Sequence, residues 1–143
     1  MKHEFKQKVF YSDTDAYGVV WHGSYLRWLE MGRMGLCDNA GYTLSKLYDA
    51  DITLPVVEIN VRYKSPAKLE EELLVVTELK EFSKISMTFL QKIYCAETQK
   101  LHIEATVKVV ATHNDGNIYR KFPEDLSDFV KKVTDNEYEN QIK

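Results

Sequence analysis

Two carboxylates, Asp13 and Asp15, stand in a short polar stretch just ahead of a segment with a helical pattern, and His22 stands at its expected start. The first N–H groups of a helix have no partner inside it, and the helix dipole places partial positive charge there. These groups can hold a carbonyl oxygen that becomes negative during a reaction. A nearby carboxylate can attack that carbonyl or activate water, and His22 can donate a hydrogen bond or orient a group.

The same residues also have a purely structural interpretation. Asp13 and Asp15 can cap backbone N–H groups of the loop and helix, and His22 can be a structural histidine. Glu30 and Arg33, three residues apart, favour a surface ion pair. The sequence contains no nucleophile elbow, phosphate-binding loop, dinucleotide fingerprint or C-x-x-C motif, and its four histidines lack metal-ligand spacing. We therefore expect neither a metal nor a cofactor.

Hydrophobic periodicity predicts the elements that position these residues. Residues 22–39 have the three- and four-residue apolar spacing of one helix face, which Gly41 should end. Gly32 and Gly35 lie inside that helix and predict the close approach of another backbone. Five segments have strand patterns, and a short amphipathic helix follows them: strands 5–11, 54–64, 72–82, 85–96 and 101–113, and helix 123–134. In the fourth strand Gln91 interrupts an apolar face, and in the fifth His102 falls on the polar face.

The order of these elements is a strand, a long helix and then four strands in antiparallel succession, which is an α+β layer architecture. A long apolar helix with two internal glycines favours a curved antiparallel sheet wrapped around it, as in the hot-dog fold. Residues 1–143 should form this single domain.

The composition excludes several classes of protein. There are 19 Lys+Arg against 22 Asp+Glu, a net charge of −3, and no basic cluster for nucleic acid. The N-terminus lacks the apolar core of a signal peptide, and no apolar run is long enough to span a membrane. We expect a cytoplasmic protein in which Cys37 and Cys95 are reduced core residues.

The stretch DTDAYGVVWHGSY at 13–25, followed by Trp28, Leu29, Glu30 and Arg33, resembles the N-terminal signature of the 4-hydroxybenzoyl-CoA thioesterase family. The likeness is greatest to the small bacterial acyl-CoA thioesterases associated with the Tol–Pal system. It continues through residues 55–57, 61–63, 65–67 and 105–110 and ends near Pro123, so it covers most of the chain.

This resemblance implies hydrolysis of acyl-CoA thioesters, with Asp15 as nucleophile or general base. The backbone N–H at His22 would polarise the thioester carbonyl, and Gly18 would let the loop pass close to its neighbours. Glu30 stands where the hydroxybenzoyl enzyme has an Asp that binds the phenolic hydroxyl. The hydroxybenzoyl enzyme binds CoA with a basic triplet, and of the three matching residues here only Lys84 keeps the charge. The remaining residues expected at the substrate are Tyr17, Val19 and Trp21.

The resemblance also implies a homodimer or homotetramer with active sites at the dimer interface, because an unpaired sheet edge invites association. The weak basic triplet leaves acyl carrier protein as an alternative carrier of the acyl group. Two other functions are compatible with Asp15 and His22. One is a hot-dog hydratase or dehydratase acting on acyl thioesters, and the other is a non-catalytic module that binds acyl-CoA or acyl carrier protein. Tyr25 and Trp28 are expected in the core.

Overall fold

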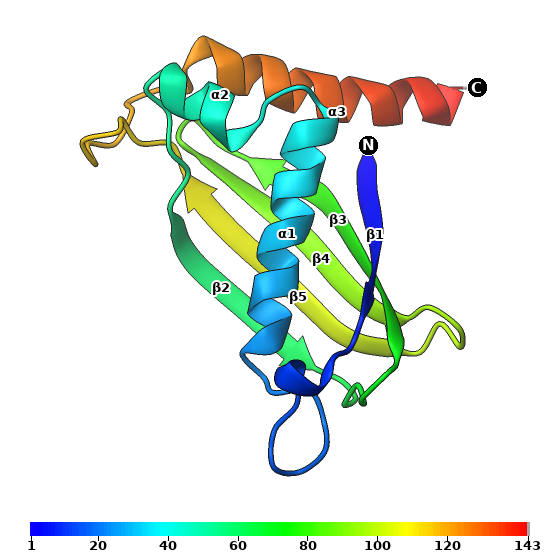
Figure 1. Ribbon diagram of the computed structural model, residues 1–143. Helices are drawn as coiled ribbons and strands as arrows, with labels where there is room; N and C mark the ends of the chain where they lie inside the picture. The colour runs from blue at the N-terminus through cyan, green and yellow to red at the C-terminus, as the bar shows by residue number, and fades with distance from the viewer. Residues whose placement is uncertain (143) are drawn as a thin grey trace.

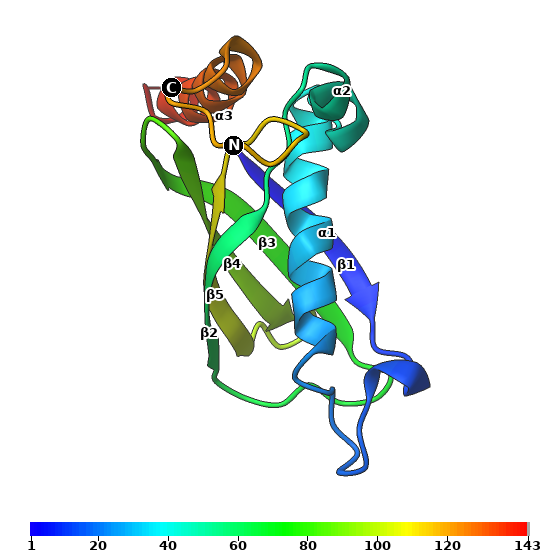
Figure 2. The same cartoon turned by 90° about the vertical axis from the view of Figure 1, so that its left-hand side faces the viewer.

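One long helix lies against a curved antiparallel sheet in the computed structural model, which describes residues 1–142 and side chains as far as Thr134 (Figures 1 and 2). The helix is α1 (Ser24–Asn39). The strands are β1 (Lys2–Lys8), β2 (Val56–Tyr63), β3 (Glu72–Phe82), β4 (Ser86–Cys95) and β5 (Leu101–Val110). Two further helices, α2 (Leu44–Asp49) and α3 (Glu124–Ile142), lie near the C-terminal end of α1.

The strand order in the sheet is β1-β3-β4-β5-β2, so β1 and β2 are its two edges. The expected antiparallel succession is correct for β3, β4 and β5 but wrong for β2, which pairs with β5. The reason is the connection after β2. Lys64 and Ser65 both donate their N–H groups to the carbonyl oxygen of His102, which draws the chain past the start of β5 on its way to β3. The α+β hot-dog arrangement is confirmed.

The apolar face of α1 forms the core with the concave side of the sheet. All five residues predicted for this face are buried: Tyr25, Trp28, Leu29, Gly32 and Leu36. The helix ends where expected, and Gly41 takes a φ of 87°, a left-handed conformation that suits a residue without a Cβ. Cys37 and Cys95 are buried and free, which confirms that expectation.

The two glycines inside α1 make room for side chains, so the prediction of another backbone there is wrong. A Cβ at Gly32 would collide with Thr77 Oγ1, and one at Gly35 would collide with the ring of His3. Thr77 comes from β3 and His3 from β1, so each glycine lets the helix settle onto one polar side chain of the sheet.

Some element boundaries differ from those predicted. The first strand lies at Lys2–Lys8 rather than 5–11, because Tyr11–Asp13 form a 3₁₀ turn, η1. The helix begins at Ser24 rather than His22, and the last helix runs well past residue 134. His102 is 2% exposed rather than on a solvated face, because the connection between β2 and β3 covers it. No helix in the described range combines the length and apolarity needed to cross a bilayer.

Candidate active site

Asp13 fixes both ends of the loop that leads into α1. Its side chain is almost fully buried, and Oδ2 accepts the N–H of Phe10 at 2.9 Å while Oδ1 accepts the guanidinium of Arg27 at 2.6 Å. Its carbonyl oxygen accepts the N–H of Trp21 at 2.9 Å and the hydroxyl of Ser24 at 3.0 Å. One residue thus joins the turn before the loop, the end of the loop and the first two turns of the helix.

Asp15 lies inside the loop and folds it into a tight turn. Its Oδ1 accepts the N–H of Tyr17 at 2.8 Å, its own N–H donates to Val19 O at 2.9 Å, and its carbonyl accepts the N–H of Gly18 at 3.1 Å. Gly18 has a φ of 80°, which this turn requires. Capping of backbone N–H groups therefore accounts for only one of the two carboxylate oxygens of Asp15. Within the described chain, Oδ2 of Asp15 makes no hydrogen bond.

The N-terminus of α1 carries backbone donors that no group of the described residues accepts. Gly23 is the N-cap, and no side chain caps the helix. The N–H of Ser24 donates to Trp21 O at 2.9 Å, whereas the N–H groups of His22 and Gly23 find no acceptor among the described residues. The His22 ring is exposed beside Trp21, and its carbonyl oxygen accepts the hydroxyl of Tyr63 at 3.2 Å. Unused donors at this position are what an oxyanion site needs.

A cavity of about 230 Å³ opens beside this helix end. It is lined by Val20, His22, Tyr25, Tyr63, Lys64, Ser65 and Pro66. Burial raises the pKa of the Tyr25 hydroxyl; the N–H of Ala67, which donates to it at 3.0 Å, opposes this, and the charges of Glu71 and Asp15 add to the rise. The hydroxyl therefore stays protonated near neutral pH, and the Asp15 carboxylate is close enough to influence it.

Four predicted substrate residues lie in the loop but do not line this cavity. Tyr17 is 91% exposed at the loop tip with Gly18, and Trp21 is 50% exposed. Val19 is half-buried and forms an isolated bridge with Lys68 of the β2–β3 connection. The structure thus places Tyr17, Gly18, Val19 and Trp21 around Asp15 and His22.

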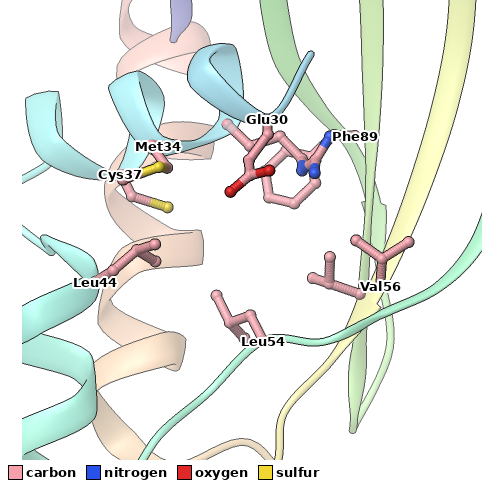
Figure 3. A pocket seen from close by; sticks show the side chains of 9 residues that line it. Glu30, Met34, Cys37, Leu44, Leu54, Val56 and Phe89 are labelled. Carbon is pink, nitrogen blue, oxygen red and sulfur yellow. The ribbon is translucent and has the colours of Figure 1, made fainter. Parts of the chain in front are cut away.

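A second cavity of about 250 Å³ runs beside α1 and is mostly apolar (Figure 3). Glu30, Met34 and Cys37 reach it from the helix, and Leu44, Leu54 and Val56 lie across from them. The other three lining residues are Arg33, Phe89 and Val109. Burial, reinforced by Asp38 and opposed by Arg33, raises the pKa of the Cys37 thiol to about 12, so this thiol is not a nucleophile.

Arg33 is held by the sheet, so the predicted surface ion pair with Glu30 is wrong. Its guanidinium donates to Gln91 Oε1 at 3.0 Å. The amide of Gln91 in turn donates to Leu29 O and to Thr77 Oγ1, both at 2.8 Å. Burial lowers the pKa of Arg33 and the charge of Glu30 opposes that effect, but the two side chains form no ion pair in the described structure.

The structure does not bring Lys84 to the other predicted site residues of the same chain. Lys84 lies in the turn between β3 and β4, next to the pair Phe82 and Met87. The loop of Asp15 contacts the connection that precedes the opposite end of β3. Glu30 reaches the second cavity rather than the one beside His22.

The cavity residues Tyr63, Ser65 and Arg33 were not predicted as site residues, and neither was Gln91, which accepts a hydrogen bond from Arg33. The one available signal was Gln91, because an amide in an otherwise apolar strand face must have a buried partner. Across the described residues, no three His, Cys, Asp or Glu side chains are grouped to hold a metal ion.

Comparison with known proteins places this arrangement in a family. Residues 9–130 match the model of the Thioesterase-like superfamily. The acyl-CoA thioester hydrolase YbgC of Escherichia coli O6:H1 is 35% identical over 103 residues, which cover 72% of this chain and 76% of that protein. The acyl-CoA thioesterase YbgC of Helicobacter pylori strain 26695 is 30% identical over 113 residues, or 73% and 77% of the two chains.

The fold itself matches a solved thioesterase. A mutant 4-hydroxybenzoyl-CoA thioesterase bound to 4-hydroxybenzoyl-CoA superposes with a TM-score of 0.81 at 20% identity, over 92% of this chain and 98% of that one. The residues that match the family model, 9–130, include the loop of Asp15, helix α1 and all strands except β1. The chain belongs to the Thioesterase-like superfamily.

Proposed function

We propose that this protein hydrolyses acyl-CoA thioesters to a free acid and CoA. The proposal is carried by two features of the loop and the helix that it enters: Oδ2 of Asp15 makes no hydrogen bond within the described chain, and the N–H groups of His22 and Gly23 find no acceptor there. The names of the YbgC relatives support the same reaction. The loop that Asp13 fixes supplies the carboxylate of Asp15, and the start of α1 supplies N–H donors for an oxyanion.

In the proposed reaction the thioester oxygen accepts the N–H groups of His22 and Gly23, which stabilise the charge that develops on it. Asp15 then acts in one of two ways. As nucleophile, its carboxylate forms a bond to the carbonyl carbon, the C–S bond breaks, and water hydrolyses the resulting anhydride. As general base, it takes a proton from water while that water adds to the carbonyl carbon. In both routes the CoA thiolate leaves and is protonated.

The acyl group is proposed to occupy the apolar cavity beside α1. Its volume of about 250 Å³ lies just below the usual range for ligand pockets, which favours a short or single-ring acyl group. Glu30 adds one carboxylate to this wall (Figure 3). Lys64, beside His22 in the other cavity, supplies positive charge for an anionic carrier, and Lys84, which lies away from this cavity in the same chain, is proposed as a further contact from a second copy.

The active form is proposed to be a homodimer joined at β2. This edge strand is solvent-exposed along nearly all its length and carries Val56, Val57, Ile59 and Tyr63 on its surface. Pairing with a second copy would satisfy its free backbone groups and bury these apolar side chains. Val56 also lines the apolar cavity, so a partner at this edge would help to close it.

The test is hydrolysis of acetyl-, hexanoyl-, palmitoyl- and benzoyl-CoA, with free thiol and free acid measured in the same reaction. The proposal requires equal amounts of both products from at least one substrate. Loss or gain of water across a carbon–carbon bond without thiol release would show a dehydratase or hydratase. Tight binding without any product would show a binding module. Faster release from acyl carrier protein than from CoA would identify the carrier.

A further inference from the structure

His102 lies at the centre of a buried hydrogen-bonded network that joins three segments of the chain. The residue is 2% exposed, and its Nε2 is 2.9 Å from Oε1 of Glu71. Its Nδ1 is 2.8 Å from Ser65 Oγ and 3.1 Å from Ser65 O. Ser65 Oγ also donates to Leu101 O at 2.9 Å. The network therefore connects the end of β2, the start of β3 and the start of β5.

Serine, histidine and glutamate are the residue types of a hydrolytic triad, but their hydrogens are placed differently here. The hydroxyl hydrogen of Ser65 goes to Leu101 O, and Nδ1 of His102 faces a carbonyl oxygen, which can only accept. In this arrangement Nδ1 donates to Ser65 O and does not take a hydrogen from the serine. The neighbouring N–H groups of Lys64 and Ser65 both donate to His102 O and cannot hold an oxyanion.

On the other side of the ring, Nε2 faces a carboxylate oxygen, so it carries a hydrogen and donates it to Glu71. Glu71 is fixed further, because its Oε2 accepts the N–H of Lys68 at 3.0 Å. Removing one partner of a hydrogen-bonded pair that includes a buried group is costly, because the remaining polar group is left unsatisfied. The pair therefore holds residues 65–71 firmly against β5.

Residues 65–68 in turn form the wall against which the candidate active site rests. Ala67 O accepts the N–H of Val20 at 2.9 Å, and the N–H of Ala67 donates to the hydroxyl of Tyr25 at 3.0 Å. Ser65 lines the cavity that His22 also lines. One of these bonds reaches the loop of Asp15 and another reaches the first turn of α1.

We infer that His102 and Glu71 are positioning residues for hydrolysis, acting through residues 65–68 on the loop of Asp15 and the start of α1. The inference rests on the proposed function. A displacement of about 1 Å at reacting groups can lower a rate by about a hundredfold, so a network outside the site can control turnover.

The test compares His102→Gln with His113→Gln in the full-length protein. His113 is a matched control because its ring is also paired with a carboxylate, that of Asp51 at 2.6 Å, beyond the opposite end of β5. For hexanoyl-CoA we expect His102→Gln to lower kcat by at least about tenfold with a smaller change in KM, and His113→Gln to change kcat by less than about twofold. Glu71→Gln, which keeps an oxygen acceptor but no charge, should lie between them.

A second readout does not depend on activity. Amide hydrogen exchange should accelerate by at least about tenfold at Val20 and Ala67 in the His102 variant, with no change in the paired residues of β3 and β4. If His102→Gln fails to fold, Ser65→Ala and Glu71→Gln are measured in the same way. A folded variant with wild-type kcat or wild-type exchange at these two amides would overturn the inference. If wild type releases no thiol while the exchange shift is present, the positioning role stands and the proposed reaction fails.

Discussion

The guanidinium of Arg27 lies 2.6 Å from Oδ1 of Asp13, a carboxylate that is 2% exposed and that fixes the loop of the candidate site. Arg27 itself is mostly exposed, so the cation reaches in from the helix surface to neutralise a buried anion. Asp13 and Asp15 are two residues apart and have different environments. Both oxygens of Asp13 accept hydrogen bonds, whereas Oδ2 of Asp15 accepts none from the residues that the structure describes.

Arg27→Ala should therefore destabilise the fold by about 1–2 kcal/mol, because it leaves the Asp13 carboxylate buried with only one backbone donor on its side chain. Solvent around Arg27 keeps the loss below that of a fully buried pair. Urea unfolding at pH 7 measures the change. Lys92→Ala is the control, since its contact with Glu104 is 3.8 Å long and the Glu104 carboxylate is far more exposed than that of Asp13. Equal losses for both variants would contradict a special role for Arg27.

Asp15→Asn should lower kcat for a good acyl-CoA substrate by at least about a hundredfold, since it removes the nucleophile or base but keeps the shape of the side chain. KM should change much less, because the acyl and carrier contacts lie on other residues. The amide can still accept the N–H of Tyr17, so the turn should survive. Steady-state hydrolysis by folded variants checks this. Retention of more than about a tenth of kcat would make Asp15 a capping residue only.

His22→Ala should reduce kcat less than Asp15→Asn, because the proposed donor at this position is the backbone N–H, which the substitution keeps. The imidazole ring is exposed and makes no hydrogen bond within the described chain. The same assay, run beside Asp15→Asn, measures the difference. A loss as large as that of Asp15→Asn would show that the ring itself takes part in catalysis.

The stability of the protein should fall as the pH drops below about 4.5, partly through Glu71. Burial raises the pKa of Glu71, but the N–H of Lys68 and the His102 ring outweigh burial and hold the pKa below its ordinary value of 4.5. A carboxyl with a lowered folded-state pKa stabilises the fold above its unfolded pKa, and this stabilisation is lost as the pH falls through the folded value.

Urea unfolding between pH 7 and pH 3 should therefore show a free-energy difference between wild type and Glu71→Gln that is constant at neutral pH and shrinks in acid. Glu97→Gln is the control, because the exposed Glu97 makes no ion pair in the described structure. A difference that stays constant down to pH 3 would show that Glu71 has an ordinary pKa.

Ile59→Lys should convert a dimer to a monomer, because it places charge on the exposed edge β2 that is proposed to pair with a second copy. Light scattering at micromolar concentration measures the mass, and Lys6→Glu on the opposite edge is the control. A wild-type protein that is monomeric and fully active would contradict the proposed dimer.

The features that local periodicity determines could be predicted from the sequence. Strand β3 has the predicted bounds, and the buried face of α1 contains all five residues predicted for it. The pairing of β2 with β5 could not be predicted, since it depends on contacts between residues far apart in the chain. The burial of Gln91 and His102 could not be predicted either, because their hydrogen-bond partners, Leu29 and Glu71, lie far away in the chain. The roles of the residues around Asp15 were indicated by the family resemblance and stay predictions.

The two edges of the sheet differ in a way that bears on how large an assembly can grow. Edge β1 alternates exposed charged residues with half-buried ones, and the exposed ones are Lys2, Glu4, Lys6 and Lys8. Edge β2 is apolar. Repeated lysines repel an incoming strand. Edge-to-edge pairing would therefore be disfavoured at β1 even where β2 can pair with another copy. A chain with one receptive edge and one guarded edge can pair once and then stop, which keeps it from polymerising at high concentration.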